Sequence, residues 1–510
     1  MILGDGDRAN ASAGGTTLDD LFRRVGVRNP EGLALVDPPN RAAFTGGAPR
    51  SLNFAEADRA ISALAARLRG LGLYSDTVVA IQLGNVVESI VALLGVLRAG
   101  MIAAPIPLLW RQRDMIEALG RVGARAIITA PRIGAYAHTE IAMQVAAELF
   151  PIRYVCAFGD DLNDGVVPLD DIFDGPQCNL PMQAARPGNP AAHVAVVTYD
   201  RGSDGWIPVA RSHVELAAGG LSIFLESGLA ARAPILSTIP LGSFAGLSLT
   251  LLPWLLNGST LHLHHGFDAD AFAAQCATLH GGMVVLPAPA FAPIAETGVL
   301  DPAAAVAALW RAPERMTSGA PWFGEAALID VASFGEIGLV AAKRARDGTP
   351  APIPYGRMYN PHDAAGAVAS LETMRTRANT LALRGPMVPR HAFPPGADRF
   401  GEPHLAVADD GFVDTGFACR LDRDAGTLTV SGPPGGYAGI GFYRFRQDDL
   451  ETDIGSIDRA ATIVALPDAL LGQRLAGSAP DRAALQRDLQ TRGVNPLVVQ
   501  AFRTRKRNTA

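Results

Sequence analysis

Lysine is almost absent from this chain of 510 residues. Its lysines are Lys343 and Lys506, and arginine supplies the other basic groups. Any mechanism that depends on a lysine side chain therefore has two candidates. With a formal net charge of −6, the chain also lacks the broad basic surface that nucleic acids bind, so we expect no nucleic-acid partner.

Cysteines and long apolar runs are equally scarce. The four cysteines lie far apart and form no Cys-x-x-Cys pair. This spacing predicts free thiols, no structural metal and a location in the reducing cytoplasm. The first residues show neither the basic start nor the apolar core of a signal peptide. No apolar run approaches the ~20 residues that a transmembrane helix needs, so we expect no membrane span.

What the chain does have is a regular alternation of helical and extended patterns. Asn53 and Glu56 have the spacing of a capping box, which predicts a helix after residue 53. Val78 to Leu83 is typical of a buried strand, and Asn85 is expected to cap the next helix. Strands that alternate with helices predict an α/β fold, in which parallel-rich sheets carry helices on both faces.

The stretch from His193 to His213 carries the clearest chemical signal. An apolar β-branched run, Val194 to Thr198, predicts a strand, and Gly202 to Gly205 predicts a loop. An apolar helical pattern begins after Ser212. A strand, a glycine-bearing loop and a helix together can cradle a phosphate, because loop N–H groups and a helix N-terminus point at the anion. Asp204 would repel that anion, and its alternative interpretation is an ordinary turn residue.

This stretch resembles the phosphate loop of the adenylate-forming superfamily, which includes the acyl-CoA synthetases. The usual family loop reads Thr-Ser-Gly-Thr-Thr-Gly-x-Pro-Lys-Gly, and its lysine position falls on Ile207 or Val209 in this sequence. The segment from Asp410 to Phe417 resembles the family's Asp-Gly-Trp-Phe-x-Thr-Gly-Asp. Its final aspartate, which grips the ribose in the family, is replaced here by Phe417, and Asp414 is the nearby substitute.

The resemblance also assigns candidate site residues. Glu336 occupies the position of the family's Mg²⁺-binding glutamate, and Lys506 is the one candidate for its C-terminal catalytic lysine. The alternative interpretations are a solvated glutamate at a helix start and a lysine in a solvated tail. The candidates for nucleotide binding are Gly202, Ser203, Ser318, Gly319, Ala320, Pro321, Phe334 and Asp414. The candidates for the acyl pocket are Ser243, Phe244 and Gly246.

The domain organisation follows from the same resemblance. It implies an N-terminal AMP-binding-like domain over residues 17–420, with subdomains of about 17–190 and 191–420. A small, shortened α+β C-terminal domain would occupy residues 421–510. The polar run from Arg420 to Asp424 is the expected hinge between the two domains.

As a function, the resemblance implies an AMP-dependent acyl-CoA synthetase or ligase. Such an enzyme uses ATP and Mg²⁺ to convert a small carboxylic acid to an acyl-adenylate, and then forms a thioester with CoA. In this sequence the phosphate loop, the ribose aspartate, the hinge arginine and the terminal lysine are all altered, which predicts reduced ATP chemistry. The alternative is a non-catalytic relative that binds an acyl or nucleotide ligand or a partner protein. A homodimer is a further possibility that the sequence leaves open.

Overall fold

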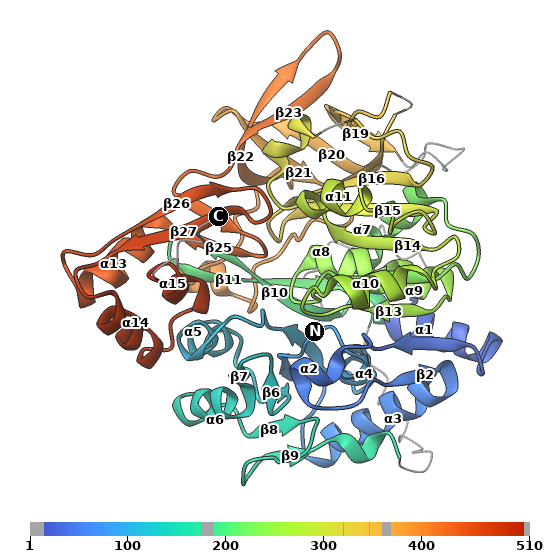
Figure 1. Cartoon of the computed structure of the whole chain (residues 1–510), viewed down its shortest axis with the longest axis vertical. Coiled ribbons are helices and arrows are strands. Elements are labelled where there is room, and N and C mark those ends of the chain that lie inside the picture. The colour runs from blue at the N-terminus through green and yellow to red at the C-terminus, as the bar shows by residue number, and fades with distance from the viewer. Residues whose placement is uncertain (1–14, 175–187, 320, 346, 360–368, 504–510) are drawn as a thin grey trace.

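Four large sheets organise the molecule (Figure 1). The computed structural model describes residues 15–174, 188–319, 321–345, 347–359 and 369–503. The parallel-rich sheets with covering helices, together with a small C-terminal α+β part, confirm the predicted fold class. No helix in the described residues is long and apolar enough to cross a bilayer.

The first sheet has seven strands, and its central strands are parallel. In sheet order the strands are β11 (Gly205–Ser212), β10 (Val194–Gly202), β4 (Ile102–Pro105), β3 (Val78–Ile81), β5 (Ala126–Thr129), β8 (Tyr154–Ala157) and β9 (Val167–Pro168). Alternate residues of β3 enter different cores, because successive side chains of a strand point to opposite faces. Helices α3 (Phe54–Gly70) and α4 (Val87–Arg98) cover one face, and α5 (Gln112–Val122) and α6 (His138–Glu148) cover the other.

The second sheet has eight strands and joins distant parts of the chain. In sheet order they are β17 (Gly338–Lys343), β16 (Ala327–Phe334), β15 (Ala305–Trp310), β14 (Met283–Pro287), β12 (Ile235–Ser237), β13 (Leu261–Leu263), β1 (Leu33–Val36) and β2 (Ser51–Asn53). The predicted division at residue 190 therefore does not follow the sheets. β1 and β2 belong to the second sheet, while β10 and β11 complete the first.

Several helices cover this second sheet. α7 (His213–Ser227) and α9 (Leu252–Asn257) pack on one face, and α10 (Ala269–Cys276) and α11 (Ala288–Ala295) pack on the other. The short α1 (Leu18–Arg28) packs against α3, α4 and α9. A single large core connects α4 of the first sheet with α7 and α9 of the second, so the two sheets fold as one body.

Helix α4 shows how the sequence builds this shared core. All of its residues from Val87 to Arg98 are buried, which suits a helix that is apolar on nearly every side. The predicted capping box of α3 is confirmed, with Asn53 and Glu56 bonded reciprocally. The predicted cap of α4 is wrong. Asn85 donates instead to the carbonyl oxygens of Ile239 and His264, and so ties α4's start to the second sheet.

The last two sheets are antiparallel. The third contains β18 (Ile353–Pro354), β23 (Thr427–Gly432), β22 (Val413–Asp422), β21 (Thr380–Arg384), β20 (Ala369–Arg375) and β19 (Gly356–Tyr359). The fourth contains β25 (Tyr443–Arg446), β24 (Tyr437–Ile440), β27 (Gly472–Ser478) and β26 (Thr462–Asp468). Helices α13 (Gln447–Ile457), α14 (Arg482–Thr491) and α15 (Pro496–Gln500) complete the part at the left of Figure 1.

The predicted hinge lies within the third of these sheets. The expected hinge from Arg420 to Asp424 is the end of β22 and the turn into β23, inside the third sheet. The chain leaves that sheet at Gly432 and enters the fourth at Tyr437. We therefore use "C-terminal domain" below for residues 437–503, and the connecting segment is Pro433 to Gly436.

Candidate functional site

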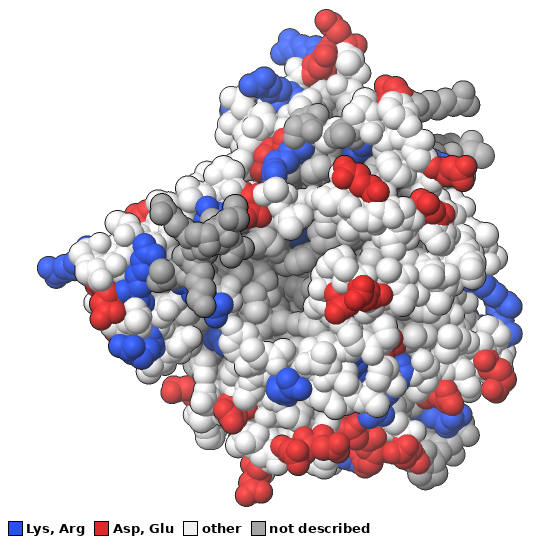
Figure 2. Space-filling view, viewed as in Figure 1, with Lys and Arg blue, Asp and Glu red and all other residues white. Residues whose placement is uncertain are grey.

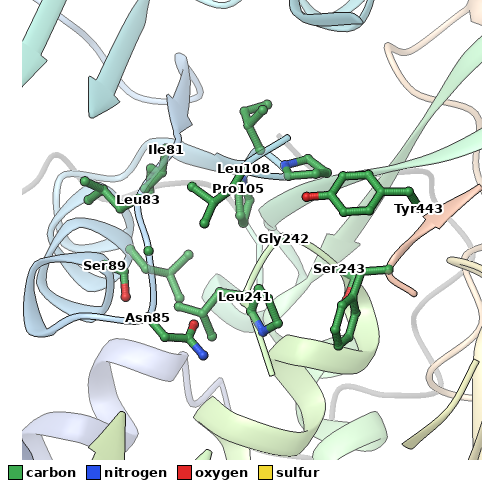
Figure 3. A pocket seen from close by; sticks show the side chains of 16 residues that line it. Ile81, Leu83, Asn85, Ser89, Pro105, Leu108, Leu241, Gly242, Ser243 and Tyr443 are labelled. Atoms are coloured by element: carbon green, nitrogen blue, oxygen red, sulfur yellow. The ribbon is translucent and has the colours of Figure 1, made fainter. Parts of the chain in front are cut away.

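An apolar cavity lies where the carboxyl ends of β3, β4 and β12 meet the C-terminal domain. Its volume is ≈ 70 Å³, and we call it the apolar cavity. It is lined by Ile81, Leu83, Gly84, Asn85, Ser89, Leu93, Pro105, Ile106, Pro107, Leu108, Pro240, Leu241, Gly242, Ser243, Phe442 and Tyr443. Figure 3 shows Tyr443 reaching in from the C-terminal side, opposite Leu83, Asn85 and Ser89. Parallel α/β folds bind ligands in such crevices beyond the strand ends.

A second cavity with charged walls adjoins the first, and we call it the polar cavity. The two share Pro107, Gly242, Phe442 and Tyr443. The charged side chains of the polar cavity are those of Asp200, Arg201, Arg311, Glu336 and Arg444. In Figure 2 the face is hollowed between the C-terminal domain and the rest of the molecule.

The predicted phosphate loop is a closed β-hairpin. β10 and β11 pair all the way from Val194 with Ser212 to Gly202 with Gly205, so that Ser203 and Asp204 form the turn. The predicted strand–loop–helix arrangement is therefore wrong at its centre. A two-residue turn between paired strands has no open loop whose N–H groups could converge on an anion. Ser212 caps α7 through a capping box, which is its structural interpretation.

The tip of this hairpin is engaged with other parts of the protein. Arg446 of the C-terminal domain donates to the carbonyl oxygen of Ser203, and Arg121 of α5 donates to that of Asp204 at 3.0 Å. Glu117 of α5 accepts from the Trp206 N–H at 2.8 Å. A side chain on Gly205 would collide with this carboxylate, because an added Cβ would lie 1.9 Å from its Oε1.

The hairpin's first strand also carries a charged link to the C-terminal domain. Arg201 pairs with Asp449 at 2.6 Å, and Arg444 pairs with Asp200 at 2.9 Å. Asp200 also accepts from the N–H groups of Arg201 and Glu336, at 2.8 and 2.9 Å. Both of its carboxylate oxygens are therefore engaged by donors of the protein itself.

Glu336 lies among arginines. Its side chain is 4% exposed, and its Oε2 accepts from the Phe244 N–H at 2.7 Å. Burial raises the pKa of this carboxyl, and the positive charges of Arg211 and Arg311 lower it. Arg211 is 1% exposed, stacks 3.7 Å above the Phe244 ring and donates to the Glu336 carbonyl oxygen. Burial lowers the pKa of Arg211 to about 10.

This arrangement does not fit a Mg²⁺ ion. Mg²⁺ requires near-octahedral oxygen ligands and keeps several water molecules. The two carboxylates of the polar cavity, Asp200 and Glu336, instead accept hydrogen bonds from the protein and neutralise arginines. The residues of this cavity therefore do not support a metal-dependent step.

Comparison with known proteins identifies the family of this chain. A family model described as AMP-binding enzyme matches residues 30–327. The chain belongs to this AMP-binding family. It is 27% identical over 486 residues to a 2-hydroxy-7-methoxy-5-methyl-1-naphthoate–CoA ligase of Streptomyces carzinostaticus, which takes in 90% of this chain and 82% of that protein.

Other relatives match over a shorter length or in fold alone. Long-chain fatty acid transport protein 1 of Mus musculus is 27% identical over 272 residues, which are 51% of this chain and 39% of that protein. The chain thus matches about two fifths of that relative's length. The amide bond synthetase McbA of Marinactinospora thermotolerans superposes with a TM-score of 0.70 at 18% identity, covering 94% of both chains. MbtA of Mycobacterium smegmatis superposes with a TM-score of 0.65 at 21% identity, covering 97% and 93%.

Within this AMP-binding protein, Phe417 and Asp414, the two residues considered for the ribose position, lie on opposite faces of β22. Phe417 is 2% exposed, and its ring meets that of Phe334 edge to face at 5.5 Å. Phe334, which was predicted to contact the nucleotide, is fully buried in the core. Asp414 is exposed on the opposite side of β22 from Phe417 and accepts from Thr380 and Gly416. An odd residue spacing along the strand puts the substitute aspartate on the wrong face.

The predicted adenine turn lies beside β15 and β16. Its Gly319 packs near Trp310 and Arg344, and Pro321 is exposed. Neither residue lines the apolar or the polar cavity. Ala320 and Lys506 lie outside the described residues. The backbone of Ser318 ends the 3₁₀ turn η5 (Pro313–Ser318).

Of the three predicted acyl-pocket residues, the structure brings Ser243 to the apolar cavity. Phe244 is buried beneath Arg211, and Gly246 lies so close to the Pro240 carbonyl oxygen that an added Cβ would be 1.9 Å away. Sequence reasoning missed the cavity walls that follow β3 and β4, and also Phe442 and Tyr443. The signal for the first group was their position after buried strands, where ligands of parallel sheets bind.

Proposed function

We propose that this AMP-binding family member binds a small carboxylic acid and activates it with ATP slowly or not at all. The observation that carries the proposal is the closed turn of Ser203 and Asp204 between β10 and β11. Acyl-adenylate formation builds negative charge at phosphorus, so it requires preorganised donors or cations there. In this chain the groups nearest the former loop bind one another.

The arginines around the hairpin do not supply a replacement. Arg201 is paired with Asp449, and Arg211, a residue of β11, is buried with its guanidinium on the Phe244 ring. A phosphate would have to displace these partners and remain in contact with Asp200 and Glu336. Loss of one preorganised oxyanion donor typically lowers a rate by ~10²–10³. We therefore expect an adenylation rate at least ~10³-fold below a typical kcat of about 10 s⁻¹.

An acid-dependent exchange assay tests the proposal. Labelled pyrophosphate exchanges into ATP when an enzyme forms acyl-adenylates reversibly, and the assay should be run with aliphatic and aromatic acids. The expected result is no exchange above a boiled sample of the same chain. Acid-dependent exchange at about 1–10 s⁻¹ would show an active acid–thiol ligase with a rebuilt phosphate site.

Heat protection provides an independent measurement. A ligand at 100 times its Kd stabilises the folded state by ~2.7 kcal/mol. We expect carboxylic acids to raise the Tm and Mg-ATP to leave it unchanged. A rise with Mg-ATP alone would show that the chain binds nucleotide and would contradict this expectation.

A further inference from the structure

Arg311 is the charged residue that lies between the two cavities. It follows the last residue of β15, and its Nη1 donates to the Ser243 hydroxyl at 3.3 Å. Its Nη2 donates to the Phe442 carbonyl oxygen at 3.5 Å. Both distances are at the long end for hydrogen bonds, and a guanidinium has five N–H donors. Ser243 and Phe442 line the apolar cavity, while Arg311 itself lines the polar one.

The other arginines of the polar cavity have carboxylate partners. Arg201 pairs with Asp449 at 2.6 Å, and Arg444 pairs with Asp200 at 2.9 Å. Among the residues that the structure describes, no carboxylate oxygen lies within 4.0 Å of Arg311. Glu336 and Asp200 act on it only at longer range. Arg311 is therefore the guanidinium of this cavity that can still accept a close anion.

The apolar cavity limits the size and polarity of the group that is attached to this anion. Its walls are mainly aliphatic, with Phe442 and Tyr443 of the C-terminal domain closing the side next to Arg311. Tyr443 is held in place because its Oη accepts from the Leu109 N–H at 2.9 Å. A dry cavity of about 150 Å³ accommodates benzene, so ≈ 70 Å³ suits a tail of about three to five carbon atoms.

We propose that Arg311 binds the carboxylate of a short-chain monocarboxylic acid, whose alkyl tail occupies the apolar cavity. The inference rests on the proposed function and names its ligand class. A planar guanidinium suits a carboxylate because two parallel N–H groups can meet both oxygens. An acid held in this way is neutralised by Arg311 beside Glu336, rather than presented to a nucleotide phosphate.

Calorimetry on the full chain without ATP tests the ligand class. The probes are butyrate, its neutral analogue butyramide and the long-chain acid dodecanoate. We expect butyrate to bind about 10–100-fold more tightly than butyramide, because the charge-assisted bond is absent from the amide. Dodecanoate should bind more weakly than butyrate. Equal affinities for acid and amide, no binding of butyrate, or tighter binding of dodecanoate would overturn the proposal.

Three variants test the residue. Arg311→Gln should abolish the preference for butyrate over butyramide, because it weakens butyrate binding far more than butyramide binding. Arg311→Lys should keep a smaller preference, since it retains the charge and loses the planar fork. Arg315→Gln is the matched control, because Arg315 borders a neighbouring cavity and donates to the Asp468 carbonyl oxygen instead.

The outcomes separate this inference from the proposed function. An undiminished preference in Arg311→Gln would overturn the role of Arg311. If that variant does not fold, an undiminished preference in Arg311→Lys would do the same. Pyrophosphate exchange concerns ATP, so an active exchange reaction would refute the slow-activation proposal and leave the acid–amide comparison to be decided by its own measurement.

Discussion

The two sides of the central crevice differ in structure: one is an apolar cavity, and the other is filled by a closed hairpin. On the apolar side, β3, β4 and β12 end at a cavity whose walls come from buried, closely packed elements. On the phosphate side, β10 and β11 close into a hairpin whose tip binds α5 and the C-terminal domain. The walls of the apolar cavity form whenever the chain folds, because the packing of α4 and the sheets builds the core. An open phosphate loop adds nothing to that core, so it can be lost without loss of the fold.

The largest effect is expected when an aspartate replaces Phe417, the residue at the position of the family's ribose-binding aspartate. Phe417→Asp should lower the free energy of unfolding by about 4 kcal/mol or more, because it removes a buried ring packed on Phe334 and buries a carboxylate. Urea unfolding measures the loss, with Phe417→Leu as a milder control. A stable Phe417→Asp variant that gains Mg-ATP binding would contradict this comparison. It would show that a single substitution is enough to restore nucleotide binding.

Glu336 distinguishes a structural counter-ion from a metal ligand. Glu336→Gln should lower the free energy of unfolding by about 3 kcal/mol, because Arg211 and Arg311 lose a buried carboxylate. Glu314→Gln is the matched control. Burial raises the pKa of the Glu314 carboxyl, and its Oε2 has no hydrogen-bond partner among the described residues, so its neutralisation should cost nothing. Unchanged stability of Glu336→Gln together with weakened Mg-ATP binding would restore the metal-ligand interpretation.

Features of the fold with a local sequence signal could be predicted, and features that depend on distant residues could not. Local patterns predicted the capping box of Asn53 and the buried strand β3. Hydrogen bonds between near neighbours decide the first, and a short continuous apolar run, typical of a strand buried on both faces, decides the second. Motif order predicted the family. The pairing of β1 with β13 was not predictable, because it joins residues more than two hundred positions apart with no local signature.

The site was harder to predict than the fold. The hairpin was missed because polar residues such as Arg211 usually mark a solvated loop, whereas this arginine is buried on an aromatic ring. Arg311 gave no signal because its hydrogen-bond partners, Ser243 and Phe442, are distant from it in the sequence. Ser243 was found through the family resemblance, and the cavity contains it.

A pH titration tests whether the buried His138 stabilises the walls beside the apolar cavity. Burial lowers the pKa of His138 to about 3, and the charge of Arg111 contributes. The folded state thus favours the neutral ring, so this contribution to stability is complete above pH 6.5 and is lost as the pH falls towards 3. The ring contacts Gln82, whose amide donates to the carbonyl oxygens of Pro107 and Trp110 beside the cavities.

Urea unfolding at several pH values measures this contribution. Between pH 6 and 4 the free energy of unfolding should fall by up to ~1.4 kcal/mol per pH unit on account of His138. His138→Gln should reduce that slope, and replacement of the exposed His280 by Gln should not. The same slope in all three proteins would mean that His138 already accepts a proton in the folded state.

The smallest effect concerns the salt bridge that joins the hairpin to the C-terminal domain. Arg444→Gln removes the pair with Asp200 at the polar cavity and should loosen docking by about 1 kcal/mol, since the pair is partly exposed. Proteinase K should then cut the exposed Gly435–Gly436 connection about fivefold faster. Arg113→Gln is the matched control, because it removes a more exposed pair with Asp453 between the same two parts. If both variants are cut at the wild-type rate, the charges do not hold the C-terminal domain. Packing of Phe442 and Tyr443 against the apolar cavity would then hold it, and the apolar side would determine docking as well as ligand size.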